Sequence, residues 1–600
     1  MQKIKAILAK NFESFAYFYR YLRYRIFISI TLSIVVGFLD GLGLSMFLPL
    51  FQVLDPSAPK TENALTGPVA FLPKLLDYFS INFDIYSVLV ILCVFFCLKG
   101  VAQYIRTSYQ VVLQQSFIKQ IRLTLIACLN KIGYKYFVGS DVGRIQNTLS
   151  AEVDRVARAY QTYFTALQFS VFVLVYMGFA FFVDFKFALV VSVGGLLTNL
   201  IYKKLYAKTK GASRELTLSN HLFQSLIIQR VANFKYLKAT GSDERFSKKL
   251  INTTIDIEKD NRKIGILSSI LTATREPLLI FVVVLVIFIQ VAVLKGGLST
   301  IIVSLIFFYK ALNALMFVQT QTNLFLAVSG SLNNMSEFTD ELQSNEEKDG
   351  TIVTTGINTG IRFENVSFAY NNERIILGNI NLTFPKNQTI ALVGESGSGK
   401  TTLVNLLVGL IQPTSGKILL DELSLSEINK HAFQQKVGYI TQDPVIFNDT
   451  IFNNVTFWDP PTEQNKERFY RALEQSSAAD FVASLPGKEN EMLGNAGINL
   501  SGGQKQRLSI ARELYKDINL LVLDEATSAL DSETEQNIQK NIDALKGKYT
   551  VVIIAHRLST VRSADIVCFL KNGKIEATGS FEELTNTNAD FQRMVKMQEI

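Results

Sequence analysis

The chain has 600 residues, of which 48% are hydrophobic and only 19% are charged. About 150 residues per domain gives room for about four domains, and average soluble proteins carry about 25% charged residues, so part of this chain avoids water. This composition excludes a disordered chain, and four cysteines exclude a disulfide scaffold. The formal net charge of +8 leaves a membrane protein and a nucleic-acid-binding protein to be distinguished.

Long apolar stretches occupy the chain up to about residue 340. A helix needs about 20 residues to cross about 30 Å of hydrocarbon at about 1.5 Å per residue. Six stretches come close to or exceed that length: Ile26–Val53, Ile85–Ile105, Thr162–Val183, Phe185–Tyr202, Pro277–Leu294 and Thr300–Val318. We therefore expect six membrane-spanning helices.

The lysines and arginines of the connecting segments set the orientation. Residues 1–25 contain six, residues 106–160 contain eight and residues 203–276 contain fifteen, whereas the intervening loops contain two, one and one. Because cytoplasmic segments carry the excess of positive residues, the N-terminus and these long segments are predicted to be cytosolic. This distribution accounts for much of the positive charge, so no nucleic-acid partner is expected.

The two long cytosolic segments carry apolar residues at helical spacing and almost no proline. They predict helices that continue beyond the bilayer and fold back at turns around Phe137–Ile145 and Gln229–Tyr236. Polar residues 338–358 are predicted to be a linker. Short Val/Ile/Leu runs then alternate with helical patterns, as in a parallel α/β sheet. The predicted architecture is an all-α transmembrane domain (1–337) followed by an α/β nucleotide-binding domain (359–600).

The strongest motif is a P-loop between an apolar strand at 389–393 and a helical pattern at 402–408. Its glycines let backbone N–H groups converge on phosphate oxygens, and the helix N-terminus adds a favourable field. Lys400 is expected to reach the β and γ phosphates of ATP, and Thr401 to bind Mg²⁺. The residues are Gly394, Glu395, Ser396, Gly397, Ser398, Gly399, Lys400 and Thr401, followed by Thr402.

A second apolar strand, residues 520–523, places Asp524 and Glu525 at its C-terminal end, where open α/β sheets bind ligands. Asp524 is suited to the Mg²⁺ shell, and Glu525 to orienting and polarising the attacking water. Together with the P-loop, this pair predicts a site that hydrolyses a nucleoside triphosphate.

Between these motifs, the sequence LSGGQ resembles the signature of ATP-binding-cassette (ABC) ATPases; its residues are Leu500, Ser501, Gly502, Gly503 and Gln504. Four further positions stand in the family's order. Tyr370 resembles the adenine-stacking aromatic and Gln442 the Q-loop glutamine, a Mg²⁺ ligand. Asp531 resembles the D-loop aspartate and His556 the switch histidine. The resemblance covers the whole chain and implies an exporter-type half-transporter.

The signature joins a serine hydroxyl and two glycine amides at a helix start, an anion site without a lysine. Such a site completes a P-loop and does not replace one. In the family, two cassettes sandwich two ATP molecules head to tail, so the resemblance implies a homodimer or a pair with a related half-transporter. It also implies that the two cytosolic turns are coupling helices. Asn495 stands where the family's exporters usually have a glutamate, which makes an ion-pair role there doubtful.

Charged residues lie in or beside the apolar stretches, where charge is costly and normally faces a cavity; they include Asp40, Lys99, Arg106, Arg275 with Glu276, and Lys310. One hypothesis is that the four cations form a track for an anionic headgroup. The alternative is that Lys99 and Lys310 snorkel and that Asp40 pairs with one of them. Spans one and six look like those of ABC flippases for lipid-linked oligosaccharides.

These observations predict ATP-driven export or flipping of an amphipathic substrate, such as a lipid or lipid-linked glycan, across a bacterial inner membrane. A multidrug or peptide exporter is the alternative in the same class. An ATP-gated channel or nucleotide-sensing regulator is disfavoured because Glu525 and His556 are both present. His221 and His431 have no comparable context and are expected to be structural.

Overall fold

The computed structural model describes residues 13–54, 84–183, 185–292, 298–370, 374–524, 540, 543–544, 546–555 and 558–598. The chain divides into two compact units, which we describe separately. The membrane unit comprises Met1–Ile132 and Ser140–Glu346, and the nucleotide unit comprises Gly133–Gly139 and Glu347–Ile600. The first predicted turn, Phe137–Ile145, is therefore divided between the two units at Gly139 and Ser140.

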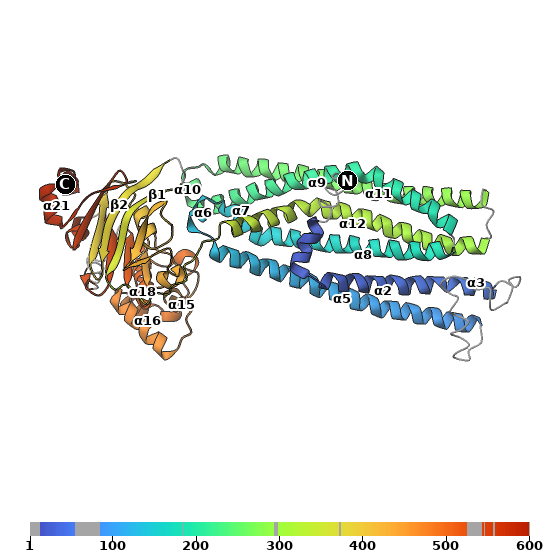
Figure 1. Cartoon of the computed structure of the whole chain (residues 1–600), viewed down its shortest axis with the longest axis horizontal. Coiled ribbons are helices and arrows are strands. Elements are labelled where there is room, and N and C mark those ends of the chain that lie inside the picture. The colour runs from blue at the N-terminus through green and yellow to red at the C-terminus, as the bar shows by residue number, and fades with distance from the viewer. Residues whose placement is uncertain are drawn as a thin grey trace. The chain divides into compact units, whose positions relative to one another are not determined.

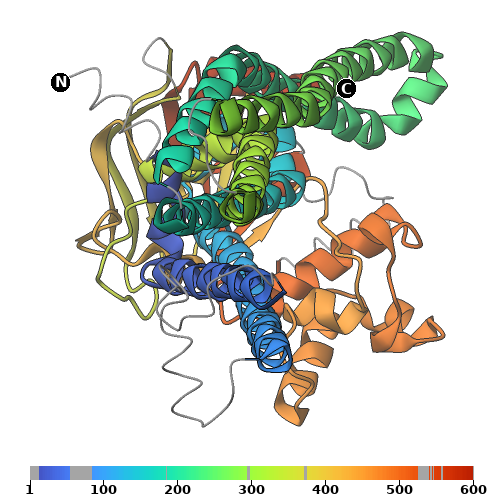
Figure 2. The ribbon, with the colours of Figure 1, turned by 90° about the vertical axis from the view of Figure 1, so that its right-hand side faces the viewer.

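The described part of the membrane unit is helical (Figure 1). Its helices pack lengthwise in pairs: α2 lies beside α5, α8 beside α12, and α9 beside both α11 and α12. Figure 2 looks along the bundle and shows α2 and α5, in blue, side by side. The elements are α2 (Arg25–Ser45), α3 (Phe47–Leu54), α5 (Ile85–Lys131), α7 (Val142–Asn147), η3 (Thr148–Glu152), α8 (Val153–Val183), α9 (Phe185–Ala232), α10 (Phe234–Ala239), α11 (Asp243–Ala292) and α12 (Leu298–Ser344).

The length of the helices confirms that they continue beyond the bilayer. The 47 residues of α5 extend for about 70 Å at about 1.5 Å per residue, more than twice the hydrocarbon thickness. Among the described residues, Arg25–Leu50, Ile85–Lys131 and Val142–Phe182 are long and apolar enough to span a membrane. Of the other three predicted spans, Phe185–Tyr202 and Thr300–Val318 fall within α9 and α12, and Pro277–Leu294 begins in α11, which ends at Ala292. All three include residues or side chains outside the described part.

Two details differ from the predicted pattern. The stretch 26–53 is divided at Met46 into α2 and α3, because Pro49 has no N–H to donate to the carbonyl of Ser45. The polar segment 338–358 is helical as far as Ser344, and the chain joins the nucleotide unit at Glu347. There Asp349 accepts hydrogen bonds from the Lys430 backbone and the Asn429 side chain.

The nucleotide unit contains two sheets. Strands β2-β1-β4-β5 form an antiparallel sheet, and β10-β9-β3-β8-β7-β6 form a sheet in which β9, β3, β8, β7 and β6 are parallel. The strands are β1 (Gly360–Ala369), β2 (Ile375–Pro385), β3 (Thr389–Gly394), β4 (Ser415–Leu420), β5 (Leu423–Ser424), β6 (Val437–Ile440), β7 (Leu520–Asp524), β8 (Thr550–Ile554), β9 (Ile566–Lys571) and β10 (Lys574–Gly579). This arrangement confirms the predicted parallel α/β domain.

Helices cover the larger sheet, and two apolar clusters form the core. One cluster joins α13 to residues of both sheets, and the other joins β3, β7 and β8 to α15, α16 and α18. The described helices of the nucleotide unit are α6 (Tyr134–Gly139), α13 (Lys400–Leu407), α14 (Lys430–Gln434), α15 (Ile451–Thr456), α16 (Glu463–Gln475), α17 (Ala479–Ser484), η4 (Lys488–Asn490), η5 (Asn495–Gly497), α18 (Gly502–Tyr515), α20 (Leu558–Arg562), α21 (Phe581–Thr587) and α22 (Ala589–Gln598). At the edge of the smaller sheet, the Asp421 carboxylate accepts three backbone N–H groups from residues 358–360.

Candidate functional site

The carboxyl ends of three parallel strands bring the sequence motifs to one edge of the large sheet. β3 leads into the P-loop, β6 leads to Gln442, and β7 ends at Asp524. Strands β3 and β7 flank β8 in the sheet, so motifs separated by 130 residues of sequence converge because of the strand order. This is the edge at which open α/β sheets bind ligands.

The P-loop has a backbone that requires glycine. Gly397 and Gly399 have φ angles of 80° and 102°, in the left-handed region that side chains rarely adopt. A Cβ on Gly394 would lie 2.1 Å from the Leu570 carbonyl oxygen, so no side chain fits there. Backbone N–H groups can therefore approach a ligand without a covering side chain, as binding of a phosphate chain requires.

Two polar side chains of the loop fit a phosphate ligand. The buried Lys400 ammonium donates to the carbonyl oxygens of Gly394 and Glu395, at 2.8 and 2.9 Å. The buried Ser398 hydroxyl makes no hydrogen bond to any residue that the structure describes. A buried hydroxyl without a partner is costly, and an oxygen-rich anion in the loop would satisfy it. Thr401 is exposed and Thr402 is buried.

Asp524 is half-buried at the end of β7, and Gln442 is exposed just beyond β6. The Tyr439 hydroxyl lies 3.4 Å from Asp524 Oδ2 and donates to it. Burial raises the pKa of Tyr439, and the Asp524 carboxylate raises it further, so the phenol stays protonated and remains a donor. Carboxylate, amide and hydroxyl oxygens are ligands that Mg²⁺ accepts, so Asp524, Gln442 and Thr401 are chemically suited to hold this ion.

Tyr370 follows β1 and is partly exposed, as an aromatic that stacks on a base must be. Its ring packs edge-on against Phe368, with centroids 4.8 Å apart. Lys135 of α6 donates to the Ala369 carbonyl oxygen at 3.2 Å, and its ammonium lies 5.6 Å from the centroid of Phe368. Helix α6 thus contacts the end of β1, the strand that leads to Tyr370. Sequence reasoning missed Lys135, because nothing near residue 135 indicates its pairing 234 residues away.

The signature residues begin a helix. Gly502 is the first residue of α18, and Ser501 is its N-cap, accepting from the Gln504 backbone while Gln504 accepts from the Ser501 backbone. Leu500 is buried beneath them, and Gly503 is the second residue of the helix. Asn495 is exposed. Glu525, Asp531 and His556 lie outside the described residues.

In the membrane unit, Asp40 is buried and has three partners. Lys99 Nζ lies 2.6 Å from Oδ1, Lys310 Nζ lies 3.8 Å from Oδ2, and the Tyr176 hydroxyl donates to Oδ2. The cluster joins α2, α5, α8 and α12. Both lysines of the hypothetical cationic track are therefore paired with one carboxylate, and the three charged groups carry a net charge of +1.

Arg106 is buried on α5, with its guanidinium 5.9 Å from the centroid of the Phe172 ring. Its Nε and Nη1 atoms make no hydrogen bond to any described residue. Arg275 lies on α11, and its side chain is outside the described part. A track that includes Arg106, Arg275, Lys99 and Lys310 remains a prediction.

Both halves of the chain match known protein families. Residues 26–320 match the "ABC transporter transmembrane region", and residues 377–528 match "ABC transporter". The structure is similar to a chain in the "Structure of a bacterial Atm1-family ABC exporter with ATP bound", with a TM-score of 0.78, 21% identity, and coverage of 96% of this chain and 99% of that one. The protein thus has the fold of an exporter-type, multi-pass membrane protein with an ATP-binding domain.

Two relatives align along nearly the whole chain. An "ATP-dependent lipid A-core flippase" of Desulfotalea psychrophila is 31% identical over 576 residues, which cover 92% of this chain and 96% of the relative. "Heterocyst differentiation ATP-binding protein HepA" of Nostoc sp. is 26% identical, covering 95% of each chain. The protein belongs to the ABC transporter family and is an ATP-driven transporter.

Proposed function

We propose that two copies of this chain hydrolyse ATP, with Mg²⁺, to flip an anionic amphipathic lipid carrying a glycan across a bacterial inner membrane. The observation that carries the proposal is the similarity to a lipid A-core flippase over 92% of the chain, because it spans both the membrane unit and the nucleotide unit. Other relatives with the same printed name support it, including one from Burkholderia orbicola that is 30% identical over 83% of this chain.

The residues at the sheet edge divide the chemical work. Lys400 and the backbone of the P-loop would hold the phosphates, and Thr401, Gln442 and Asp524 would hold Mg²⁺, which neutralises charge on the phosphoryl oxygens. Glu525 would orient the attacking water and accept its proton, and His556 would contact the γ-phosphate. Residues Leu500–Gln504 of one copy would complete the site of the other, since a helix start without a lysine can supplement a P-loop.

The test is reconstitution into liposomes of phosphatidylethanolamine and phosphatidylglycerol, with ATP turnover measured against added compounds. A lipid A-core glycolipid is expected to accelerate turnover, and Glu525→Gln to abolish it. A hydrophobic cation or an apolar peptide serves as the comparison ligand. Stimulation by these compounds alone would replace the proposal with a multidrug or peptide exporter. Ion flux that requires bound ATP without turnover would indicate a channel.

A further inference from the structure

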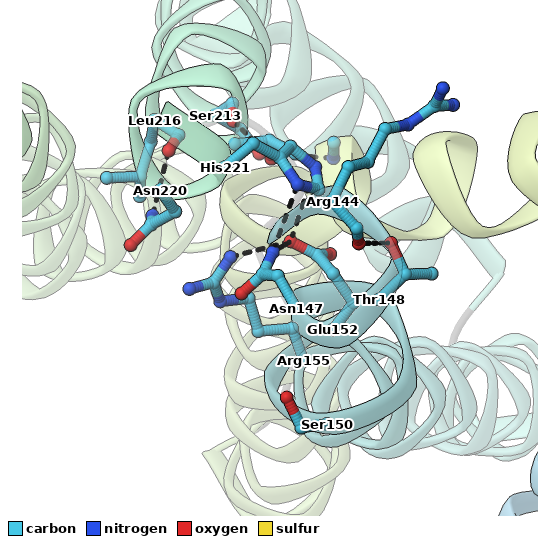
Figure 3. A network of polar contacts seen from close by, with 12 residues as sticks. Arg144, Asn147, Thr148, Ser150, Glu152, Arg155, Ser213, Leu216, Asn220 and His221 are labelled. Carbon is cyan, nitrogen blue, oxygen red and sulfur yellow. Dashed lines mark hydrogen bonds and ion pairs between the residues drawn. The ribbon is translucent and has the colours of Figure 1, made fainter. Parts of the chain in front are cut away.

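A polar cluster lies where the segment after the first cytosolic turn packs against α9 (Figure 3). It joins Asn147 at the end of α7, Glu152 at the end of η3 and His221 on α9. Asn147 and Glu152 are buried, and the His221 side chain is 11% exposed. The cluster stands beyond the apolar stretches of α8 and α9, on the predicted cytosolic side of the membrane.

The helical geometry of η3 builds this cluster. Residues 148–152 form a π-helical turn, in which the repeat is five residues in place of four. Asn147 and Glu152 therefore reach the same face, and Asn147 Nδ2 donates to Glu152 Oε1 at 3.3 Å. Such single π-helical turns inside α-helices frequently mark functional sites. The extra residue places a buried amide and a buried carboxylate against the side of α9.

The hydrogen bonds specify the protonation state of His221. A carboxylate only accepts, so the Asn147 side chain must present its NH₂ group to Glu152. The same NH₂ group lies 3.1 Å from His221 Nδ1, which must therefore accept. An imidazole that accepts at Nδ1 is neutral and carries its proton on Nε2. His221 Nε2 and Glu152 Oε2 make no hydrogen bond to any residue of the described part.

Charged groups on several sides face the ring. Burial is the largest effect and lowers the pKa of His221, and Arg144 and Arg155 lower it further. The Glu152 carboxylate, 3.9 Å from Nε2, and Asp141 raise this pKa. Arg155 also pairs with Glu152 Oε1 at 2.7 Å and so offsets the attraction of the carboxylate for a proton on the ring. On α12, Glu341 pairs with Arg144. The net effect lowers the pKa from its ordinary value of 6.5, so the ring is neutral at pH 7.

The cluster holds together two helices that lead to the cytosolic turns. α7 begins within the first predicted turn, Phe137–Ile145, and α9 leads directly to α10 at the second. Beside the cluster, a Cβ on Gly143 would lie 2.6 Å from Ser225 Cα, so the backbones of α7 and α9 are in direct contact. A change in the Asn147–His221 contact therefore changes how closely α9 packs against this segment.

We propose that His221 is a positioning residue that holds α9 against the π-helical turn while its ring is neutral and releases it on protonation. A proton on Nδ1 sets two N–H donors against each other, so the bond from Asn147 is lost. The buried imidazolium is also repelled by Arg144 and Arg155, and Glu152 is already paired with Arg155, so the ring moves away from the turn. The inference goes beyond the proposed flippase activity, because it concerns the response of the membrane unit to pH whatever the substrate is.

The experiment is hydrogen–deuterium exchange of the full-length protein in nanodiscs of phosphatidylethanolamine and phosphatidylglycerol. Exchange is compared at about pH 7.5 and about pH 4.5 and corrected for intrinsic rates; the lower value stands well below the ordinary histidine pKa because the pKa of His221 is lowered. In the wild type, protection of residues 142–155 and 213–229 is expected to fall about fivefold at the lower pH, as the loss of one net hydrogen bond predicts. His221→Gln should show no fall, because its amide oxygen accepts from Asn147 at both pH values.

Two further variants separate the proposal from a general effect of acid. His431→Gln alters an exposed histidine of the nucleotide unit and should behave like the wild type. Asn147→Ala should have low protection at both pH values. Equal wild-type protection at the two pH values would overturn the proposal, as would an acid-induced fall in His221→Gln as large as in the wild type. The readout does not use transport, so failure of the proposed function would leave it intact.

Discussion

The pairing of Asp40 with Lys99 predicts a strong energetic coupling inside the membrane unit. Lys99→Met leaves the Asp40 carboxylate buried, and loss of one partner of a buried ion pair costs about 3–5 kcal/mol. Tyr176 and Lys310 still contact the carboxylate and offset part of the loss, so we expect a cost of about 2–3 kcal/mol. Asp40→Asn keeps an acceptor for Tyr176 and leaves Lys99 22% exposed, so it should cost only about 1 kcal/mol.

The double variant Asp40→Asn/Lys99→Met contains neither member of the pair. Its cost should therefore fall short of the sum of the single costs by about 1.5 kcal/mol or more, within the range of contacting residues. Stability is measured in mixed micelles by titration with sodium dodecyl sulfate, followed by protection of the membrane unit from protease. Lys310→Met is the matched control: its side chain is 41% exposed and 3.8 Å from the carboxylate, so it should cost less than about 1 kcal/mol.

The reasoning would be refuted by additive costs, with a coupling energy below about 0.5 kcal/mol. Equal losses of stability in Lys310→Met and Lys99→Met would also refute it, because the shorter distance from Lys99 to Asp40 would then not correspond to a stronger interaction. Either result would return both lysines to the hypothesis of a track for an anionic headgroup.

Three other perturbations have expected outcomes. Gly143→Ala should lower the unfolding temperature, because overpacking against the Ser225 backbone costs about 1–3 kcal/mol, whereas Gly139→Ala meets nothing within 4 Å and should not. Burial raises the pKa of Asp421, but its backbone hydrogen bonds lower that pKa below 3.8 overall. The ionised carboxylate therefore stabilises the fold fully above pH 3.8, and this contribution is lost as the pH falls below that value. Asp421→Asn should show a smaller loss of stability in acid unfolding curves. If the cationic track carries an anionic headgroup, Lys310→Met should lower lipid-stimulated ATP turnover; unchanged turnover would exclude Lys310 from the substrate path.

The nucleotide-binding elements were the most predictable part of the molecule. The P-loop is one contiguous motif between an apolar strand and a helix, and the apolar run before Asp524 indicates a buried strand. Parallel strands then have only one edge at which such motifs can meet. The contact of Lys135 with the strand of Tyr370 was not predictable, because it pairs an ordinary surface lysine with a carbonyl oxygen 234 residues away.

The π-helical cluster was also beyond prediction, and His221 was expected to be structural. One additional residue in one helical turn leaves no periodic trace in the sequence, and Asn147 and His221 are 74 residues apart. The polar composition of residues 338–358 likewise predicted a linker, although residues 338–344 continue helix α12. Phe338 and Leu342, four residues apart, are buried on one face of α12, while polar residues around them indicate a linker.

The two carbonyl contacts of Lys400 bear on how a mutation of the P-loop is interpreted. The ammonium donates hydrogen bonds to the carbonyl oxygens of Gly394 and Glu395 and so restricts the backbone of a loop rich in glycine. Truncation of this lysine removes both hydrogen bonds along with the positive charge. A measured drop in nucleotide affinity would then have two causes: the lost attraction between ammonium and phosphate, and the entropy cost of ordering a loop that has become more flexible. The affinity of an alanine variant alone therefore overstates the strength of the ammonium–phosphate contact.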